Sequence, residues 1–228
     1  MISIQNLTTG FSGRVVLNDI TIDFERNRIH GIVGLNGAGK TTFFNTLASN
    51  QKITKGQITF NGNTLKSKDI AYLETVNFFY SRITGKEYLN IFEQTNLEFN
   101  LEGLQGFLKL PLDDLIETYS TGMKKKLALL GILKQKREVF LLDEPFNGLD
   151  LETNKILELI ITTLKEKDKT VFLSSHIIDP LLSVCDEIHF LENGCFTKKF
   201  DKLDFHKIEE ELFSKLKMEA KATISASL

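Results

Sequence analysis

The segment at residues 28–45 constrains the fold of this chain more than any other. Residues 29–33 (IHGIV) form a short apolar run suited to a buried strand, and residues 34–42 (GLNGAGKTT) follow it directly. Apolar side chains then recur at Phe43, Phe44 and Leu47, as on one face of a helix. Strand, glycine-rich loop and helix thus follow one another without a break, which predicts an α/β core.

The glycine-rich loop predicts a phosphate-binding site made of Gly34, Leu35, Asn36, Gly37, Ala38, Gly39, Lys40, Thr41 and Thr42. Its glycines lack a Cβ atom, so backbone N–H groups can point inward and an anion can approach closely. The helix that begins near Lys40 adds its free N–H groups and the positive end of its dipole. Lys40 can reach the β- and γ-phosphates, and the Thr41 hydroxyl can bind Mg²⁺. A glycine turn that only links strand to helix is the alternative, but both flanking elements match what nucleoside triphosphate binding requires.

Two carboxylates end a second apolar run, at residues 139–144 (VFLLDE). A buried strand that ends in acids places them where ligands bind in open α/β sheets. Asp143 can hold Mg²⁺ as the acidic partner of Thr41, and Glu144 can orient or deprotonate the attacking water. Two solvated acids at a strand end would be the alternative, but the phosphate loop disfavours it.

One histidine and one aromatic residue are further candidates. His176 follows the apolar run 170–174, so it can touch a γ-phosphate from the same edge of the sheet. The other histidines, His30, His189 and His206, are interpreted as surface or core residues. Phe11 lies in the turn between two predicted antiparallel strands, where stacking on a nucleotide base and a minor core contact are equally open.

Composition and the remaining pattern describe an ordinary globular chain of 228 residues, with 42% hydrophobic and 25% charged residues. A net charge of −2 gives no electrostatic argument for nucleic acid or an anionic membrane surface. The chain has no apparent secretory signal, its apolar runs are too short for a bilayer, and its two cysteines lack metal spacing, so a cytosolic protein is expected.

Two further segments are predicted to be helical. A mostly helical block at about 84–135 interrupts the strands, and residues 201–228 predict an amphipathic terminal helix.

Residues 119–123 (YSTGM) resemble the signature motif of ATP-binding cassette (ABC) proteins. The resemblance covers nearly the whole chain: Phe11, Walker A at 34–42, the signature, Walker B at 139–144, the D-loop at 148–150 and the switch histidine His176. The chain is similar to the ATPase subunits of bacterial ABC-2-type exporters, whose membrane domains are separate polypeptides. The resemblance implies a single ABC ATPase domain over residues 1–228. Its fold would be a RecA-like P-loop core with an N-terminal antiparallel β subdomain and an inserted helical subdomain.

The resemblance also implies a mechanism. In the family two cassettes pair head to tail around ATP, so Ser120, Gly122 and Asp150 would contact the nucleotide of the partner copy, with ATP and Mg²⁺ as cofactors. A homodimer is the simpler expectation. The implied partners are multi-span membrane permease subunits, with the chain peripheral on the cytoplasmic face of the membrane and no nucleic acid. Residues 124–126 (KKK), next to the signature, are interpreted as a solvated basic face.

One position departs from the family pattern. Thr75 stands where the family usually carries a glutamine, and it is too short to span from the metal or water to the helical subdomain. The helical block before Tyr119 is also short for the family. Two other functions stay open: a cytosolic ABC ATPase that does mechanical work without transport, and a nucleotide-binding regulatory module with little turnover.

Overall fold

Two sheets form the framework of the computed structural model, which describes residues 1–92 and 95–208. Within these residues the strand orders are β2-β1-β4-β5 and β10-β9-β3-β8-β7-β6. The strands are β1 Ile2–Phe11, β2 Arg14–Phe24, β3 Ile29–Val33, β4 Lys55–Phe60, β5 Asn63–Thr64, β6 Ile70–Leu73, β7 Val139–Asp143, β8 Thr170–Ser175, β9 Glu187–Glu192 and β10 Cys195–Asp201. The α-helices are α1 Lys40–Leu47, α2 Gly85–Ile91, α3 Leu101–Leu108, α4 Thr121–Leu133, α5 Leu151–Glu166 and α6 Asp179–Val184.

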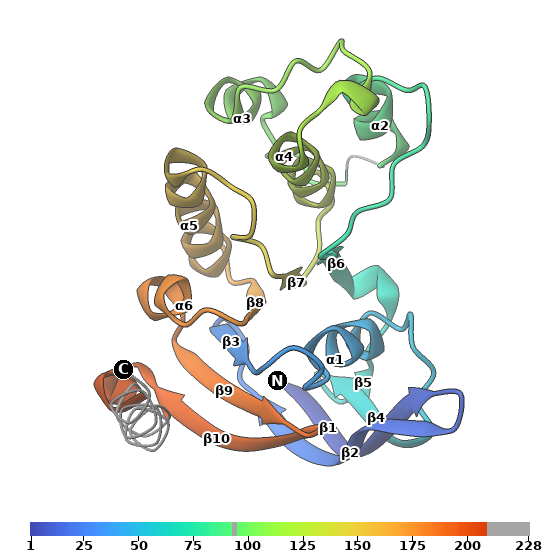
Figure 1. Cartoon of the computed structure of the whole chain (residues 1–228), viewed down its shortest axis with the longest axis vertical. Coiled ribbons are helices and arrows are strands. Elements are labelled where there is room, and N and C mark those ends of the chain that lie inside the picture. Colours follow the sequence, from blue (N-terminus) through green and yellow to red (C-terminus); the bar gives the residue numbers. More distant parts are fainter. Residues whose placement is uncertain (93–94, 209–228) are drawn as a thin grey trace, which may run out of the picture.

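The larger sheet is the α/β core that the sequence predicts. Strands β9, β3, β8, β7 and β6 run parallel, and β10 returns antiparallel beside β9. Because β3, β8 and β7 are neighbours, their carboxyl ends lie at one edge of the sheet. The glycine-rich loop follows β3, Asp143 is the last residue of β7, and His176 follows β8. The topology therefore brings distant parts of the sequence to the edge where these three strands end (Figure 1).

The smaller sheet is the antiparallel β subdomain, in which β1 pairs with both β2 and β4. The sequence of β2 predicts that alternate residues, Val16, Asn18, Ile20, Ile22 and Phe24, face the core, and this prediction is wrong at Asn18. Leu17 is buried and Asn18 is exposed, because the pairing of β1 and β2 shifts register between Leu7 and Thr9. Asp19 has a left-handed backbone (φ 49°) at this irregularity, as in a β-bulge. The shift keeps buried side chains on both sides of it facing the core.

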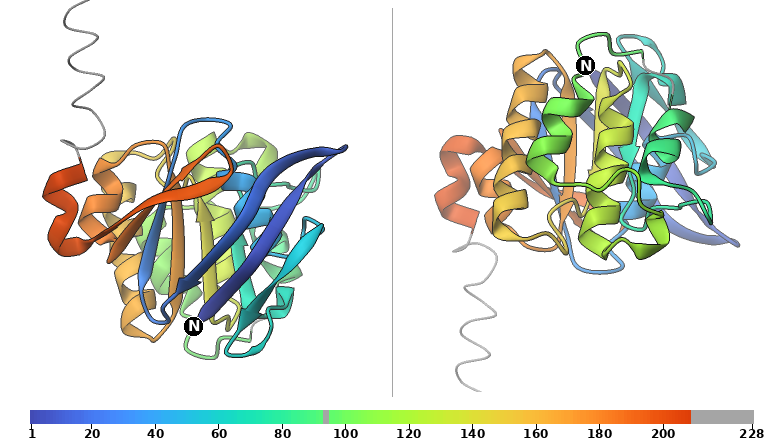
Figure 2. Two further views of the ribbon diagram at one scale, coloured as in Figure 1. Left: turned by 90° about the horizontal axis from the view of Figure 1, so that it is seen from below. Right: turned by 90° about the horizontal axis from the view of Figure 1, so that it is seen from above.

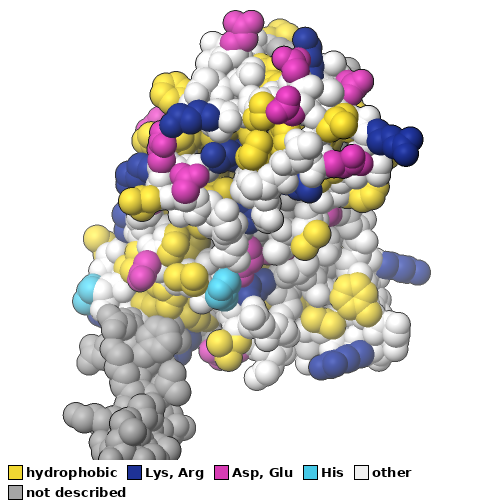
Figure 3. Space-filling model, turned by 45° about the horizontal axis from the view of Figure 1, so that its top comes forward, with side chains coloured by type: hydrophobic (Ala, Val, Ile, Leu, Met, Phe, Trp, Pro, Cys, Tyr) yellow, Lys and Arg dark blue, Asp and Glu magenta, His cyan; other side chains and the backbone are white. Residues whose placement is uncertain are grey.

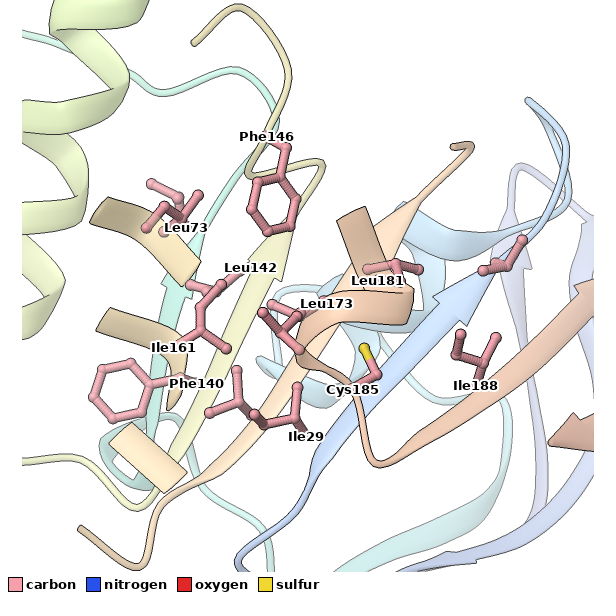
Figure 4. Packing of buried hydrophobic residues seen from close by; sticks show 14 of the residues in the cluster. Ile29, Leu73, Phe140, Leu142, Phe146, Ile161, Leu173, Leu181, Cys185 and Ile188 are labelled. Carbon is pink, nitrogen blue, oxygen red and sulfur yellow. The ribbon is translucent and has the colours of Figure 1, made fainter. Parts of the chain in front are cut away.

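Apolar residues cover both faces of the larger sheet. One cluster fills the space between the two sheets and α1, and it includes Ile4, Phe24 and Phe44. The other cluster lies between the larger sheet and the helices α4, α5 and α6. Figure 4 shows part of it, with Leu142 of β7 and Leu173 of β8 meeting side chains of the covering helices. The two sheets cross at an angle with α1 between them, as Figure 2 shows from below.

The inserted block contains α2, α3 and α4, joined by segments that are not α-helical at 95–100 and 109–120. A third apolar cluster, which includes Tyr88, Leu108 and Leu130, packs within this block. The predicted helix start at Thr84 is confirmed: its Oγ1 accepts from Glu87 N at 3.2 Å, and Glu87 Oε2 accepts from Thr84 N at 2.7 Å. This capping box fixes the first turn of α2.

The end of the chain is described only in part. A 3₁₀ helix covers Lys202–Lys207, and the amphipathic helix predicted farther on falls mostly at 209–228, outside the described residues, so it stays a prediction. Both cysteines are free, with Cys185 buried and Cys195 partly buried. Among the described residues, no helix combines the length and apolar character needed to cross a membrane.

Candidate active site

The glycine-rich loop joins β3 to α1 and curls at two glycines. Gly37 and Gly39 have φ angles of 85° and 109°, which lie in the left-handed region that other residues rarely adopt. At Gly39 a Cβ atom would also lie 2.9 Å from Leu17 Cδ2. Helix α1 starts at Lys40, immediately after this turn, so its free N–H groups point into the loop.

Lys40 places a buried positive charge inside the loop. Its side chain is 7% exposed, and Nζ donates to Gly34 O at 2.7 Å. The same Nζ lies 3.7 Å from Glu144 Oε1. It also donates to Leu35 O, at 3.5 Å. An ammonium group held by two carbonyls and one carboxylate can turn to a phosphate without leaving the cavity.

Asp143 and Thr41 form the candidate metal site. Asp143 is fully buried at the end of β7, and its Oδ2 accepts from Thr41 Oγ1 at 2.8 Å. Its other oxygen, Oδ1, accepts from Ser174 Oγ of β8. One carboxylate and one hydroxyl side by side are the hard oxygen ligands that Mg²⁺ prefers, so these residues fit the predicted ion.

Glu144 follows β7 with a left-handed backbone (φ 49°). Its side chain is 10% exposed, and Oε2 lies 3.0 Å from His176 Nδ1. Asn147 Nδ2 also donates to Oε2, at 3.3 Å, while Ser174 Oγ accepts from Glu144 N at 2.9 Å. The carboxylate therefore lies between the histidine and Lys40, next to the phosphate loop.

Lys40, Thr41 and Glu144 line a cavity of about 810 Å³, whereas Asp143 and His176 are not part of its lining. Its lining consists of Phe11, Arg14, Val15, Val16, Asn36, Gly37, Gly39, Lys40, Thr41, Thr42, Thr75, Glu144, Asn193 and Gly194. Phe11 is 51% exposed at the rim, so it is no core residue and is free to stack on a base. Gly34 and Ala38 are buried behind the lining, and Leu35 is 84% exposed. Thr75 lies in the wall of this cavity, at the place of the usual glutamine.

Several lining and supporting residues were not predicted from the sequence. Arg14, Val15 and Val16 belong to β2, and Asn193 and Gly194 form the tip of the β9–β10 hairpin. Ser174 and Asn147 hold Asp143 and Glu144 in place. The Asn-Gly pair signals the hairpin itself, but its position over the loop depends on β9 lying beside β3, which no local signal gives.

The nucleotide-binding residues predicted in the signature and the D-loop do not line this cavity either. Ser120 is exposed and is the N-cap of α4, where its Oγ accepts from Met123 N at 3.2 Å. Asp150 is the N-cap of α5, with a 65% exposed side chain, and the hydrogen bonds from Thr153 lower the pKa of its carboxyl. Gly122 lies against the D-loop, since a Cβ there would be 3.0 Å from Gly148 O. The signature and D-loop thus lie together, away from the chain's own phosphate loop.

The interpretation of residues 124–126 as a solvated basic face is wrong for Lys125. This side chain is 6% exposed, and Nζ donates to Glu144 O at 2.7 Å and to Asn147 O at 2.8 Å. Lys126 is also largely covered, with its Nζ 3.8 Å from Asp150 Oδ2. A run of three lysines on a helix necessarily spans several faces, and one of them points at the loop after β7.

Comparison with known proteins decides the family. The family model for the ABC transporter matches residues 17–147 of the chain. The chain belongs to the ABC transporter family. Its fold as a P-loop NTPase with mixed α/β topology agrees with that assignment.

Relatives of this ABC protein are ATP-binding subunits. The chain is 29% identical to the ABC transporter ATP-binding protein YtrB of Bacillus subtilis (strain 168) over 220 residues, which cover 92% of this chain and 74% of YtrB. It is 29% identical to the bacitracin transport ATP-binding protein BcrA of Enterococcus faecalis, over 91% of this chain and 71% of BcrA. A solved structure of an ATP binding subunit of an ABC transporter superposes with a TM-score of 0.84 at 26% identity, covering 96% of this chain and 98% of that chain. The chain is therefore an ABC transporter ATPase.

Proposed function

We propose that this ABC ATPase hydrolyses ATP between two head-to-tail copies of the chain and drives a separate multi-span membrane permease, as part of an exporter. The observation that carries the hydrolytic part is the Glu144 carboxylate, held 3.0 Å from His176 Nδ1 and 3.7 Å from Lys40 Nζ beside the phosphate loop. The chain would work as one ABC ATPase domain over residues 1–228, with the helical block at about 84–135 as its insertion.

The proposed chemistry is attack of water on the γ-phosphorus of ATP. The N–H groups of the loop at 34–39 and the Lys40 ammonium would hold the phosphates, because Asn36, Gly37, Gly39 and Lys40 line the cavity. Thr41 and Asp143 would hold Mg²⁺, which when bound neutralises charge on the phosphate oxygens. Glu144 takes a proton from the water, and the bond from the γ-phosphorus to the bridging oxygen breaks to release ADP. His176 orients the Glu144 carboxylate and contacts the γ-phosphate.

Two features support the head-to-tail pairing. Ser120 and Gly122 stand at the N-terminus of the 13-residue helix α4, where unpaired N–H groups favour an anion. Neither residue lines the cavity of its own chain, and the Ser120 side chain is exposed. A second copy in the reverse orientation would bring its nucleotide to this helix end, so each ATP would lie between the phosphate loop of one copy and the signature of the other.

A permease partner is supported by the relatives. YtrB and BcrA are named as ATP-binding proteins of transport systems. The net charge of −2 gives nucleic acid no electrostatic attraction. On the face in Figure 3, basic and acidic side chains are interspersed and form no continuous basic area. ATP is supplied from the cytoplasm, so the proposed place of work is the cytoplasmic face of the membrane, bound through the permease.

The Glu144→Gln variant tests the proposed hydrolytic role. It keeps the size of the side chain but removes the base, so kcat should fall by about 10²–10⁴-fold. The Kd for ATP should stay close to the wild-type value, because the phosphate loop is unchanged. Glu166→Gln is the matched control: Glu166 is exposed at the last residue of α5, and this variant should turn over like wild type.

Wild-type turnover in Glu144→Gln would show that the base is assigned to the wrong residue. A wild-type chain that binds ATP without hydrolysing it would favour the regulatory module. The same Glu144→Gln protein, held with Mg-ATP and mixed with detergent-solubilised native membranes, should retain a multi-span membrane protein. Retention of ribosomes or nucleic-acid complexes instead would favour the non-transport ATPase.

A further inference from the structure

Lys125 connects the signature helix to the candidate base. It lies in the second turn of α4, is 6% exposed, and its Nζ donates to Glu144 O at 2.7 Å and to Asn147 O at 2.8 Å. Burial lowers the pKa of the Lys125 ammonium, while the carboxylates of Glu144 and Asp143 oppose that shift. A lysine that is removed from water and directed at two backbone carbonyls is held by those two bonds.

Glu144 needs such support because its backbone is strained. Its φ of 49° is in the left-handed region, which is unfavourable for a residue with a long side chain. Ser174 Oγ fixes its N–H at 2.9 Å, and Lys125 fixes its carbonyl. The direction of the Glu144 side chain follows from this backbone conformation, so both bonds help aim the carboxylate at the cavity. Strained backbone of this kind persists only where the surroundings hold it.

We propose that Lys125 is a positioning residue for ATP hydrolysis, which holds the backbone of Glu144 and Asn147 so that the Glu144 carboxylate faces the attacking water. The inference rests on the proposed role of Glu144 as the base. Asn147 belongs to the same arrangement, since its Nδ2 donates to Glu144 Oε2 at 3.3 Å while its carbonyl accepts from Lys125. Lys125 does not line the nucleotide cavity, so its proposed role is to position Glu144 rather than to bind the nucleotide.

The chain offers a matched control in Lys134, at the C-cap of the same helix. Lys134 is also buried, at 9% exposed, and its Nζ donates to the backbone carbonyl of Leu89 at 2.8 Å. Lys134→Met and Lys125→Met remove the same chemical group from the two ends of α4. The Tm of thermal unfolding should therefore fall in both variants, whereas only Lys125→Met should disturb Glu144.

The test compares steady-state ATP hydrolysis of these variants. Lys125→Met should lower kcat by about 10- to 100-fold and leave the KM for ATP within about twofold, because it misplaces the base but not the phosphate loop. Lys134→Met should keep a kcat close to the wild-type value. If Lys125→Met does not fold, Lys125→Gln against Lys134→Gln decides the question, since the amide keeps a donor without the charge.

A double-mutant cycle with Glu144→Gln separates positioning from general damage. If Lys125 acts through Glu144, adding Lys125→Met to Glu144→Gln should change the residual rate by less than about twofold. Two results would overturn the inference. One is an equal loss of kcat in Lys134→Met and Lys125→Met. The other is that Lys125→Met lowers the rate by the same factor in the wild-type chain and in the Glu144→Gln chain. Wild-type turnover in Glu144→Gln alone would instead overturn the proposed base, which is a distinguishable outcome.

Discussion

The residues Asp143 and Glu144 are adjacent in the chain but meet different surroundings. Asp143 is fully buried and accepts hydrogen bonds from two hydroxyl groups, those of Thr41 and Ser174. Glu144 opens to the cavity and faces a histidine and an ammonium group. Hydroxyl donors stabilise a charged carboxylate that can hold a cation, whereas the second carboxylate is placed to exchange a proton with water. The two acids can therefore serve different steps.

Another group of titratable residues lies outside the site, in the core between the sheets. His30 of β3 and the β9 residues Glu187 and His189 are all at most 1% exposed. Glu187 Oε2 lies 3.3 Å from His30 Nδ1 and 3.2 Å from His189 Nε2, while its Oε1 contacts Arg28 and Lys199. His30 and Lys199 hold the pKa of Glu187 well below its usual value. His30 and His189 are thus core residues.

Stability should depend on pH through His189. Burial lowers its pKa from 6.5 to about 4, and the neighbouring His30 adds to the lowering. The unfolded chain therefore binds a proton at a higher pH than the folded chain, so the stabilising contribution is present above about pH 6.5 and is lost towards pH 4. Between pH 7.5 and pH 5 the free energy of unfolding should fall by about 2 kcal/mol from this residue.

Urea unfolding of His189→Asn at both pH values measures this contribution. The variant should lose about 2 kcal/mol less than wild type on acidification, because asparagine does not titrate. His206→Asn, which changes an exposed histidine, should keep the wild-type pH dependence. An unchanged pH dependence in His189→Asn would contradict the assignment.

Among the elements, the β9–β10 hairpin links the larger sheet to the site. Its tip residue Gly194 donates from N to Ala38 O of the phosphate loop at 3.2 Å. Its carbonyl accepts from Asn18 N of β2 at 3.1 Å. The hairpin therefore fixes the distance between the loop and the strand that carries the far wall of the cavity. A shift of this tip should change nucleotide binding even though it carries no charged group.

Replacing Gly194 with alanine tests the part played by the hairpin. Gly194 and Gly62, in the turns of two different hairpins, both have φ of 78°. A Cβ at Gly194 would lie 2.0 Å from Val16 O, whereas a Cβ at Gly62 would meet nothing within 4 Å. Gly62→Ala should cost about 1–2 kcal/mol of unfolding free energy from backbone strain alone. Gly194→Ala should cost at least about 3 kcal/mol, because the clash adds to the strain.

Titration with a fluorescent ATP analogue distinguishes the two variants functionally. Gly194→Ala should raise the Kd by about tenfold, whereas Gly62→Ala should leave it unchanged. Equal affinities in both variants would mean that the hairpin tip does not shape the cavity.

The two hairpins also mark how far the sequence predicts this site. Asn61-Gly62 and Asn193-Gly194 carry the same local signal, because an Asn-Gly pair favours a hairpin turn, and both turns form. Only the second lines the cavity, because β9 pairs with β3, about 160 residues earlier in the chain.

The burial of Lys125 likewise depends on tertiary structure. The sequence places it on a helix, but only the packing of α4 against the loop after β7 shows that it is buried. Local motifs thus predict the elements and the charged groups, whereas the supporting contacts depend on tertiary structure.

At the scale of the whole molecule, the motifs divide into two separate groups. The phosphate loop, Asp143, Glu144 and His176 come together at the edge of the larger sheet. Ser120, Gly122 and Asp150 lie at the starts of α4 and α5 and do not line the cavity. The order of motifs along the chain predicts the family and the fold, since each motif needs its own strand or helix. The account of sites completed between two chains, two in each dimer, rests on the separation of these groups.

Complementation between two inactive variants tests this central claim most directly. Lys40→Met removes the lysine that would hold phosphate in the phosphate loop. Ser120→Asp places a negative charge where the partner's γ-phosphate would lie. Aspartate is as good an N-cap as serine, so α4 should stay folded in that variant. Each variant alone should hydrolyse ATP far more slowly than wild type. In a mixed dimer, the intact loop of the Ser120→Asp chain would face the intact signature of the Lys40→Met chain.

The measurement is the ATPase rate of an equal mixture of the two purified variants. Random pairing gives one intact site in half of the dimers, so the mixture should recover roughly a quarter of the wild-type rate. A mixture that hydrolyses ATP no faster than the average of its two components would contradict the account, because the complete site would then lie within a single chain.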